Sequence, residues 1–210
     1  MKGLFITFEG PDGSGKTTQV GHLADHCLAL GLSVIRTREP GGTAISERIR
    51  ELILDVSTPE MDDVTEALLY AASRAQHVSQ VIRPALERGD IVICDRFVDS
   101  SIAYQGFARG LGEGVAMINA FAVQGLKPDL TFYMDLDPEA GLKRIGGRNS
   151  FDRLEKEAMD FHREVYRGYT ELRRQHGDRY RTLDASMPEE SLAREICRVF
   201  DQWFAAKRTQ

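Results

Sequence analysis

The sequence predicts an α/β protein in which a doubly wound, five-stranded parallel sheet carries helices on both faces. Five short runs rich in β-branched and aromatic residues recur along the chain, and longer stretches of helical character lie between them. Several of the short runs are almost continuously apolar, which is typical of strands that are buried on both faces. Strands that alternate with helices in this way indicate a parallel sheet.

The strands and helices can be assigned in chain order. The expected strands are residues 4–9, 33–38, 91–95, 130–135 and 180–183. The expected helices are residues 16–30, 44–54, 62–88, 114–124, 138–145, 154–176 and 189–205. Gly31, Gly89 and Gly177 follow three of these helices, and glycine is the usual residue just beyond a helix C-terminus. Pro84 lies inside the third helix and predicts a kink or break near Arg83, because proline removes a backbone hydrogen bond.

Length and composition fit one globular domain. The chain has 210 residues, of which 42% are hydrophobic and 28% charged, and its formal net charge is −5. A chain of this size buries roughly 70% of its unfolded surface, which is enough for a core without disulfides or metals. Because there is no internal repeat or dividing linker, we expect a single domain over residues 1–210. The composition excludes a disordered chain, a collagen and a disulfide scaffold.

Charge, apolar runs and cysteine spacing bear on partners and location. A mildly acidic chain is poorly suited to non-specific nucleic-acid binding, so we expect no nucleic-acid partner and anion binding only at a local site. No apolar run is long enough for a signal peptide or a membrane span, so we expect no membrane partner and a cytoplasmic protein. Cys27, Cys94 and Cys197 are widely spaced, which favours reduced thiols over bridges or a zinc site.

A phosphate-binding loop is the strongest motif in the chain. Residues 10–17 read Gly-Pro-Asp-Gly-Ser-Gly-Lys-Thr and match G-x-x-x-x-G-K-[ST] between an expected strand and an expected helix. In this motif the backbone N–H groups bind phosphates, the lysine reaches the β and γ phosphates, and the last hydroxyl can bind Mg²⁺. The residues that we expect to bind ATP here are Gly10, Pro11, Asp12, Gly13, Ser14, Gly15, Lys16, Thr17 and Thr18.

Two other interpretations of this loop are weaker. A glycine-rich turn between a strand and a helix can arise by chance, although a complete motif in the right context argues against that. A GTP-driven switch needs an Asn-Lys-x-Asp motif that reads guanine. The nearest sequence, at residues 126–129, is Leu-Lys-Pro-Asp and lacks the asparagine. The sequence therefore offers little support for a switch.

A second polar group follows the expected strand at residues 91–95. Asp95 and Arg96 leave this apolar strand at its carboxyl end, which is the edge where open α/β sheets bind their ligands. Asp95 can hold Mg²⁺ directly or through water, and Arg96 can bind a phosphate with two hydrogen bonds. A surface ion pair is the alternative interpretation. Beside a phosphate loop, the pair indicates phosphoryl transfer to an anionic acceptor.

Five blocks of sequence carry a family resemblance. They are residues 8–18 (Phe-Glu-Gly-Pro-Asp-Gly-Ser-Gly-Lys-Thr-Thr), 37–43 (Thr-Arg-Glu-Pro-Gly-Gly-Thr), 70–75 (Tyr-Ala-Ala-Ser-Arg-Ala), 95–106 (Asp-Arg-Phe-Val-Asp-Ser-Ser-Ile-Ala-Tyr-Gln-Gly) and 152–155 (Asp-Arg-Leu-Glu). In this order they resemble bacterial thymidylate kinases over nearly the whole chain. The resemblance implies a nucleoside monophosphate kinase of the P-loop class, which moves the γ-phosphoryl group of ATP to dTMP. The products, in the synthesis of dTTP, would be dTDP and ADP.

The resemblance implies five contacts to the acceptor nucleoside. Arg74 would hydrogen-bond the thymine edge, and Tyr70 would lie against the ring. Ser101, Tyr104 and Gln105 would contact the base and the sugar; the Tyr104 ring would crowd a 2′-hydroxyl, and the Gln105 amide would bond the base. On spacing alone, Tyr70 could be a core residue, Arg74 part of a surface ion pair, and residues 101–105 a short helix and a turn.

The resemblance also implies roles for charged residues near the phosphates. Lys16 and Arg96 would be catalytic, and Arg96 would also bind dTMP together with Arg38 and Arg50. Asp12 would accept a hydrogen bond from the 3′-hydroxyl of the acceptor, although it could also point outward to solvent. Mg²⁺ would serve as the cofactor. The residues that would hold it, directly or through water, are Thr17 and Asp95, with Glu9 as the secondary choice.

Residues 144–155 resemble the mobile lid of this family. Ser14 stands where the eukaryotic type tends to place an arginine, so the transition-state cation must come from elsewhere, as in the bacterial type. Arg148 and Arg153 are both candidates, and the sequence leaves the choice open. Arg144 is expected to bind ATP by flanking the adenine together with the loop at residues 184–188. A solvated, charged loop is the alternative interpretation. The family also implies a homodimer, formed through the helix at 62–88 and its neighbours.

Three other functions stay open on the sequence. The first is another nucleoside monophosphate kinase, acting on UMP or CMP. The second is a deoxynucleoside kinase, whose hydroxyl acceptor would need a general base such as Glu9. The third is a nucleotide binder without catalytic activity. A thymidylate kinase needs no general base, because the attacking oxygen belongs to a phosphate monoester that is already ionised at pH 7.

Overall fold

A five-stranded sheet forms the centre of the structure, and all of its neighbouring strands are parallel. The computed structural model describes residues 3–146 and 152–208. The strands are β1 (Leu4–Glu9), β2 (Val34–Arg38), β3 (Ile91–Asp95), β4 (Leu130–Asp135) and β5 (Tyr180–Asp184). Their order across the sheet is β2-β3-β1-β4-β5. The predicted number and direction of the strands are confirmed.

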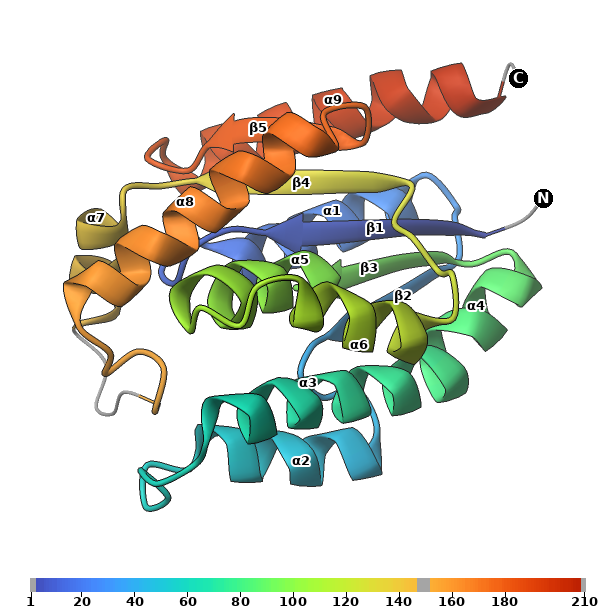
Figure 1. The fold of residues 1–210 in the computed structure, drawn as a ribbon. Helices are drawn as coiled ribbons and strands as arrows, with labels where there is room; N and C mark the ends of the chain where they lie inside the picture. Colours follow the sequence, from blue (N-terminus) through green and yellow to red (C-terminus); the bar gives the residue numbers. More distant parts are fainter. Residues whose placement is uncertain (1–2, 147–151, 209–210) are drawn as a thin grey trace.

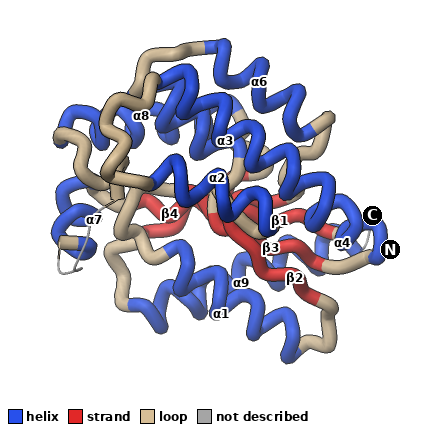
Figure 2. Tube along the Cα trace, turned by 90° about the horizontal axis from the view of Figure 1, so that it is seen from below, coloured by secondary structure: helices blue, strands red, loops and turns tan. Residues whose placement is uncertain are grey.

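Helices cover both faces of the sheet, as Figures 1 and 2 show. They are α1 (Lys16–Ala29), α2 (Ala44–Leu54), α3 (Asp63–His77), α4 (Arg83–Arg88), α5 (Val98–Ser101), α6 (Glu113–Val123), α7 (Pro138–Ile145), α8 (Met159–Gln175) and α9 (Glu189–Arg208), with the π-helical segments η1 (Val78–Ile82) and η2 (Ile102–Ala108). α1 and α9 lie together on one face, and α3, α6 and α8 lie on the other (Figure 2). Among the described residues, none of these helices combines the length and apolar character that crossing a bilayer requires. The doubly wound class is confirmed.

Successive side chains of β1 point to opposite faces of the sheet and pack in two different hydrophobic clusters. Ile6 and Phe8 lie among residues of α1 and α9, whereas Phe5 lies with Val92 of β3 and Ile82 of η1 on the opposite face. Side chains of a strand point to opposite faces in turn, so a strand that is covered on both faces must be apolar at consecutive positions. This requirement explains the continuous apolar run that marks the strand in the sequence.

The predicted helix over residues 62–88 changes its hydrogen-bond pattern before Pro84. α3 ends at His77, η1 follows, and α4 begins at Arg83 with Pro84 in its first turn. The first turn of a helix tolerates proline because its N–H groups have no partner within the helix. The backbone stays helical from residue 63 to residue 88, so Pro84 marks a change from π-helical to α-helical hydrogen bonding and not a break in the helix.

Two details of the predicted helices are wrong. α8 begins at Met159 rather than at residue 154, because the Asp152 carboxylate accepts hydrogen bonds from the backbone N–H groups of Leu154 and Glu155. Such a bond favours a turn over a helix. Residues 98–108 lie outside all predicted helices, yet they form α5 and η2. They are helical because η2 packs along α8, a contact that no local pattern reveals.

A substitution of Gly168 by a larger residue tests the packing of α8 on η2. A Cβ atom on Gly168 would lie 2.9 Å from Ala103 Cα and 3.0 Å from the Phe107 ring. We expect Gly168→Val to lower the free energy of unfolding by about 1–3 kcal/mol, because α8 would have to move away from η2. Urea denaturation measures the loss. Gly114→Ala is the matched control, since a Cβ there meets no atom within 4 Å. Equal stability of the two variants would contradict this packing.

Candidate active site

A cavity of about 340 Å³ lies at the carboxyl ends of β1, β2 and β3. The predicted site residues that line it are Asp12, Gly13, Gly15, Lys16, Thr17, Thr18, Arg38, Arg50, Tyr70, Arg74, Asp95, Arg96, Ser101, Tyr104, Gln105 and Arg144. The predicted residues Glu9, Gly10, Pro11, Ser14 and Arg153 are not part of its lining, and Arg148 lies outside the described residues. Parallel strands end at one edge of the sheet, so groups that are distant in the sequence meet there.

The phosphate loop makes its turn through glycines. Gly13 and Gly15 have φ angles of 74° and 83°, in the left-handed region that favours glycine. A Cβ atom on Gly13 would also lie 2.2 Å from the carbonyl oxygen of Gly141 in α7. The loop therefore packs directly on the backbone of α7. The strand, loop and helix that the motif requires are all present.

Lys16 folds back over the loop. Its Nζ donates hydrogen bonds to the carbonyl oxygens of Gly10 and Pro11, at 3.1 and 2.7 Å, and to Ser14 Oγ at 3.3 Å. Burial, together with the nearby Arg96, lowers the pKa of Lys16 to about 8. Phosphate oxygens would offer this ammonium group stronger, charge-assisted hydrogen bonds than the neutral carbonyls do.

Thr17 and Asp95 fit a magnesium site. Thr17 Oγ1, in the first turn of α1, donates a hydrogen bond to Asp95 Oδ2 at 2.5 Å, at the end of β3. Both residues line the cavity. A hydroxyl and a carboxylate are the hard oxygen ligands that Mg²⁺ prefers, in direct contact or through water.

Arg96 connects the end of β3 to the phosphate loop. Its φ angle of 68° is unusual for a residue with a side chain. The guanidinium donates hydrogen bonds to the Gly10 carbonyl at 2.9 Å and to Asp12 Oδ1 at 2.6 Å. It also donates to three hydroxyl groups, those of Ser100 (3.1 Å), Tyr104 (3.2 Å) and Tyr169 (3.2 Å). These contacts fix its position in the cavity wall.

Asp12 points inward rather than to solvent. Its second carboxylate oxygen accepts a hydrogen bond from the Tyr104 hydroxyl at 2.7 Å. Burial opposes its ionisation, but Arg96 and Lys16 outweigh burial and lower the pKa of Asp12 below its usual value. The alternative of an outward-facing Asp12 is therefore wrong, and the carboxylate is charged and oriented within the site.

Glu9 lies behind Arg96 and is fully buried. Its Oε1 accepts a hydrogen bond from the Phe97 N–H at 2.8 Å, and its Oε2 accepts from the hydroxyls of Ser100 and Tyr169 at 2.6 and 3.0 Å. Burial raises the pKa of Glu9 to about 7. Because both of its oxygens bond to the protein, Glu9 is a weaker candidate for a metal ligand than the two residues above.

Arg74 is 2% exposed, and the protein binds four of its N–H groups. Nε donates to Glu39 at 2.6 Å, and Nη2 donates to the Phe97 carbonyl at 3.0 Å. Nη1 donates to Ser101 Oγ at 2.9 Å and to the side-chain oxygen of Asn119. A guanidinium has five N–H donors, so among the described residues one N–H of Nη2 lacks an acceptor. Arg74 lines the cavity, where a ligand could accept that bond.

Tyr70 and Gln105 complete this wall of the cavity. Gln105 Nε2 donates a hydrogen bond to Glu66 at 2.8 Å, while its buried Oε1 has no partner among the described residues. An aromatic ring, a guanidinium and an amide are the groups with which proteins stack on a planar base and bond its edge. The wall can therefore recognise a nucleobase.

Arg38 and Arg50 lie side by side at another wall. Each donates a hydrogen bond through Nη1 to the Pro40 carbonyl, at 3.2 and 3.1 Å respectively. Burial and the neighbouring Arg38 lower the pKa of Arg50. Arg38 also pairs with Glu47. Because these two positively charged guanidinium groups lie close together, an anion that binds between them would be stabilised by both.

The two described lid arginines have different surroundings. Arg144 Nη1 donates a hydrogen bond to the Ala185 carbonyl at 2.9 Å, so the end of α7 contacts the loop at residues 184–188 beside the cavity. Arg153 instead bonds the Ile53 carbonyl at 3.0 Å and pairs with buried Glu66. The structure does not bring Arg153 to the phosphate loop.

Sequence reasoning missed several residues that hold the site together. Glu39 and Ser100 lie inside conspicuous sequence blocks, and their neighbours in those blocks could have drawn attention to them. Asn119 of α6 and Tyr169 of α8 belong to no motif. A polar residue on the apolar face of a predicted helix was the only available signal for them.

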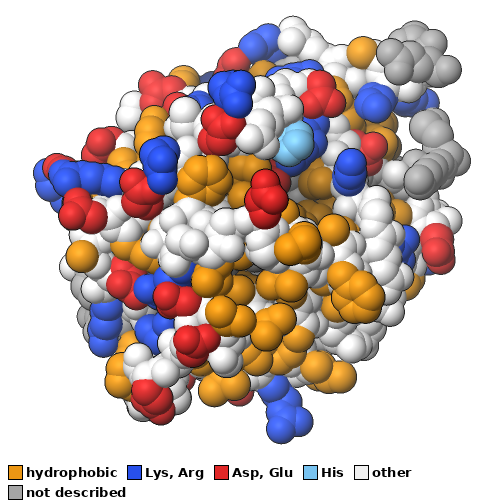
Figure 3. All heavy atoms as spheres, in the orientation of Figure 1, with side chains coloured by type: hydrophobic (Ala, Val, Ile, Leu, Met, Phe, Trp, Pro, Cys, Tyr) orange, Lys and Arg blue, Asp and Glu red, His pale blue; other side chains and the backbone are white. Residues whose placement is uncertain are grey.

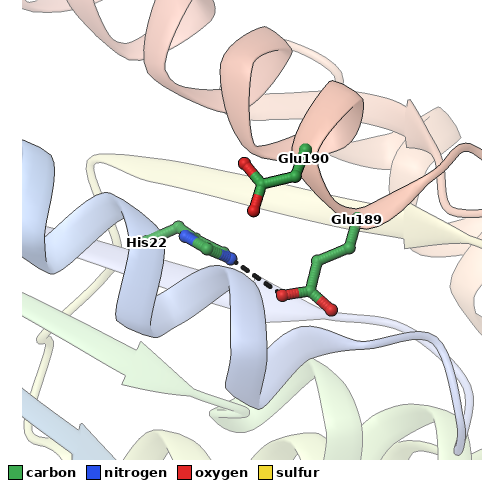
Figure 4. Close-up of side chains that lie close together, drawn as sticks. All are labelled: His22, Glu189 and Glu190. Carbon is green, nitrogen blue, oxygen red and sulfur yellow. Dashed lines mark hydrogen bonds and ion pairs between the residues drawn. The ribbon is translucent and has the colours of Figure 1, made fainter.

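A separate cluster of potential metal ligands lies between α1 and α9 (Figure 4). It consists of His22, Glu189 and Glu190, and His22 Nε2 lies 3.1 Å from Glu189 Oε1. Both glutamates are exposed. Such a pair is common where two helices meet at a surface, so we interpret it as a helix contact.

The fold, the phosphate loop and the adjoining base pocket define a P-loop enzyme of the nucleoside monophosphate kinase class. The thymidylate kinase family model matches residues 8–196. The chain is 56% identical over 190 residues to the thymidylate kinase of Lactobacillus delbrueckii subsp. bulgaricus, a match that covers 89% of this chain and 90% of that protein. The chain belongs to the thymidylate kinase family.

Further comparisons agree. The thymidylate kinase of Bacillus licheniformis is 50% identical over 205 residues, which cover 96% of this chain and 97% of that protein. The crystal structure of thymidylate kinase from Ehrlichia chaffeensis is similar with a TM-score of 0.77 and 32% sequence identity. This structural match covers 95% of this chain and 99% of that one. Similarity in sequence and in fold therefore extends over almost the full length.

Proton uptake by Lys16 when ATP binds tests whether Lys16 contacts the phosphates. With a pKa of about 8, Lys16 is largely neutral at pH 8.5, and bound phosphates favour its charged form. We expect ATP binding at pH 8.5 to take up roughly half to three-quarters of a proton. Calorimetry in two buffers with different ionisation enthalpies measures this uptake. Lys16→Arg is the control, because a guanidinium stays charged at this pH. The same uptake by that variant would contradict the assignment.

Proposed function

We propose that this chain transfers the γ-phosphoryl group of ATP to dTMP, giving dTDP and ADP in the synthesis of dTTP. The observation that carries the proposal is a single cavity whose wall contains both the phosphate loop and a base-recognition pocket. The ion pair of Arg96 with Asp12 lies between these two parts. Two nucleotides bound at the two ends would meet with their phosphates at this pair. Membership of the family supports the same activity.

The donor end of the cavity takes ATP. The residues of the loop at 10–18 surround the phosphates, and Lys16 neutralises the γ-phosphoryl oxygens. Arg144, bonded to the Ala185 carbonyl, flanks the adenine. Thr17 and Asp95 would hold Mg²⁺, which would supply positive charge to offset that of the phosphates. Their short hydroxyl–carboxylate contact supports this pair as the metal ligands.

The acceptor end takes dTMP. Tyr70 lies against the thymine ring, the remaining Arg74 N–H donates to a ring carbonyl, and Gln105 bonds the adjacent ring nitrogen. Ser101 anchors the Arg74 guanidinium beside the base. The Tyr104 ring, whose hydroxyl bonds Asp12, would crowd a 2′-hydroxyl on the acceptor sugar. This end of the cavity therefore favours a deoxyribose with a pyrimidine.

The reaction joins these two ends. An oxygen of the dTMP phosphate attacks the γ-phosphorus, and the bond from that phosphorus to the ADP oxygen breaks. The attacking monoester is already ionised at pH 7, so no general base is required. Arg38 and Arg50 hold its other oxygens, while Arg96 offsets the charge that spreads during transfer. Asp12, oriented by Arg96, accepts a hydrogen bond from the 3′-hydroxyl.

The lid supplies the final cation. We place it at residues 144–155 of a single domain that spans residues 1–210, with Arg148 and Arg153 as the candidate arginines. An arginine finger accelerates phosphoryl transfer by roughly 10³ to 10⁵. Arg153 would have to exchange its partner Glu66 for the phosphates of the bound nucleotides. That exchange is favourable where the phosphates carry more charge than one carboxylate.

The location that we propose for the enzyme is the cytoplasm. Cys27, Cys94 and Cys197 are free thiols, and burial raises the pKa of Cys27 to about 12. A raised thiol pKa disfavours the thiolate from which disulfides form. Free thiols of this kind fit a reducing compartment.

The active form is a homodimer. Leu68 of α3 and Met117 and Phe121 of α6 line an apolar depression, and the Phe121 side chain is 87% exposed. Figure 3 shows hydrophobic side chains gathered over this face. Contiguous exposed apolar surface of this kind marks protein contacts. A second copy of the chain that presents the same face would cover it.

Turnover with a panel of acceptors tests the function. With ATP and Mg²⁺ we expect the highest kcat/KM on dTMP, lower values on dUMP and UMP, and negligible turnover of thymidine. Lys16→Ala should lose at least about 100-fold in kcat while keeping the wild-type fold by circular dichroism. Thymidine turnover as fast as that of dTMP would point to a deoxynucleoside kinase. Tight ATP binding without dTMP-dependent ADP release would point to a non-catalytic binder.

Alanine substitution of the two lid arginines identifies the transition-state cation. We expect one of Arg148→Ala and Arg153→Ala to lower kcat by at least about 100-fold with little change in the KM for dTMP. The other variant serves as the matched control, because it removes the same charge from the same segment. Unchanged kcat in both variants would refute the lid proposal.

Sedimentation of a surface variant tests the dimer. Phe121→Asp places a charge at the centre of the apolar face, so we expect it to sediment as a monomer while the wild type sediments as a dimer. Glu113→Asp, at the start of the same helix, is a control that keeps the charge. A wild-type monomer at micromolar concentration would contradict the proposal.

A further inference from the structure

Glu66 contacts the Gln105 amide at the wall of the cavity. Gln105 lines the cavity, and its Nε2 donates a hydrogen bond to Glu66 Oε1 at 2.8 Å. Its Oε1 is buried and has no partner among the described residues. We infer that Glu66 is a positioning residue that makes Gln105 present a hydrogen-bond acceptor to the base. The contact thereby selects pyrimidines that carry an N3–H group. This inference deepens the proposed function and rests on it.

The chemistry of a carboxylate fixes the amide orientation. An ionised carboxylate accepts hydrogen bonds but cannot donate one, so only the Nε2 end of Gln105 can face Glu66. Rotation of the amide by 180° would set two acceptor oxygens against each other in a buried region and would lose the hydrogen bond from Nε2 to Glu66. Glu66 is 0% exposed, and it is held from other sides by Arg109 at 3.2 Å and by Arg153. Arg109 keeps the carboxylate in place beside Gln105 even when Arg153 leaves it for the phosphates.

The resulting pattern of donors and acceptors matches one class of base. Thymine and uracil carry an N3–H donor beside the O4 acceptor, whereas cytosine carries a bare N3 beside an amino group. The free N–H of Arg74 suits O4, and the Oε1 of Gln105 suits N3–H. With cytosine, the Gln105 oxygen would face the lone pair of N3. Sites that depend on buried hydrogen bonds reject ligands that leave a buried group unpaired.

The alternative is a purely structural role for Glu66, as the anchor of Arg109 and Arg153. A structural role predicts a general loss of stability or rate that affects every acceptor alike. A positioning role predicts a change in the preference between bases. The informative quantity is therefore the ratio of kcat/KM for dTMP to kcat/KM for dCMP. Any effect that Arg153 has on phosphoryl transfer is common to both acceptors and cancels in this ratio.

Glu66→Gln is the direct test. The new amide can donate as well as accept, so Gln105 can adopt either orientation. We expect the dTMP:dCMP ratio to fall at least about tenfold, with the KM for dTMP changing more than its kcat. Where this variant does not fold, Glu66→Asp keeps the charge for both arginines but withdraws the carboxylate from Gln105. For Glu66→Asp we expect the ratio to fall at least about threefold.

Two further variants separate positioning from structure. Arg109→Gln removes one guanidinium from Glu66 but leaves the bond to Gln105, so we expect its ratio to stay within about twofold of the wild type. The double variant Glu66→Gln with Gln105→Glu exchanges amide and carboxylate. The amide at position 66 can then donate to the carboxylate at position 105, whose other oxygen faces the base. We expect this exchange to restore the ratio to within about threefold of the wild type.

Each outcome is decisive. An unchanged ratio in Glu66→Gln, or in Glu66→Asp where that variant replaces it, overturns the inference. So does an equal fall in Arg109→Gln, or a double variant that keeps the low ratio of Glu66→Gln. A wild-type protein that does not phosphorylate dTMP refutes the proposed function instead, which keeps the two failures distinct. The predicted set of ratios supports Glu66 as a selector of bases with an N3–H group.

Discussion

The ion pair between Arg96 and Asp12 is the contact on which the rest of the site depends. A carboxylate inside a phosphate loop repels the ligand unless a cation compensates it, and Arg96 supplies that cation at 2.6 Å. The left-handed backbone at Arg96 and the hydroxyl groups around its guanidinium fix the cation in place. The buried Glu9 in turn accepts hydrogen bonds from two of those hydroxyl groups. The Arg96–Asp12 ion pair thus connects the end of β3, the phosphate loop and α8.

The same arrangement explains how an acidic chain can bind two polyanionic nucleotides. Carboxylates pair with Arg38 and Arg74, so these guanidinium groups are held in position before a ligand arrives. Groups oriented in advance need little reorganisation during the reaction, which is the main source of electrostatic catalysis. Pairing also cancels charge, however. Lys16, Arg50 and Arg144 instead bond neutral oxygens and line the cavity, so their charges remain available to attract the phosphates.

The parts of the structure that the sequence predicts are those in which backbone geometry demands a residue type at a fixed spacing. The phosphate loop needs glycine at Gly13 and Gly15, and Pro84 marks the change in hydrogen bonding within the helix. Contacts set by packing left no such signal. Tyr169 reaches Glu9 across 160 positions, and Arg153 pairs with Glu66, which is 87 positions away. The first pair joins α8 to β1, and the second joins the segment before α8 to α3, so both depend on how the whole chain packs rather than on a local pattern.

Shape and hydrogen-bond polarity in the base pocket are set by different layers of residues. Tyr70 lines the cavity with its ring. Buried carboxylates lie behind the polar groups, Glu39 against Arg74 and Glu66 against Gln105. A carboxylate behind a guanidinium leaves a donor facing inward, and a carboxylate behind an amide leaves an acceptor facing inward. A substitution in this second layer can therefore change which base is bonded without changing the walls of the cavity. Residues that would not touch the ligand could thus contribute to specificity, because they determine which atoms their neighbours expose.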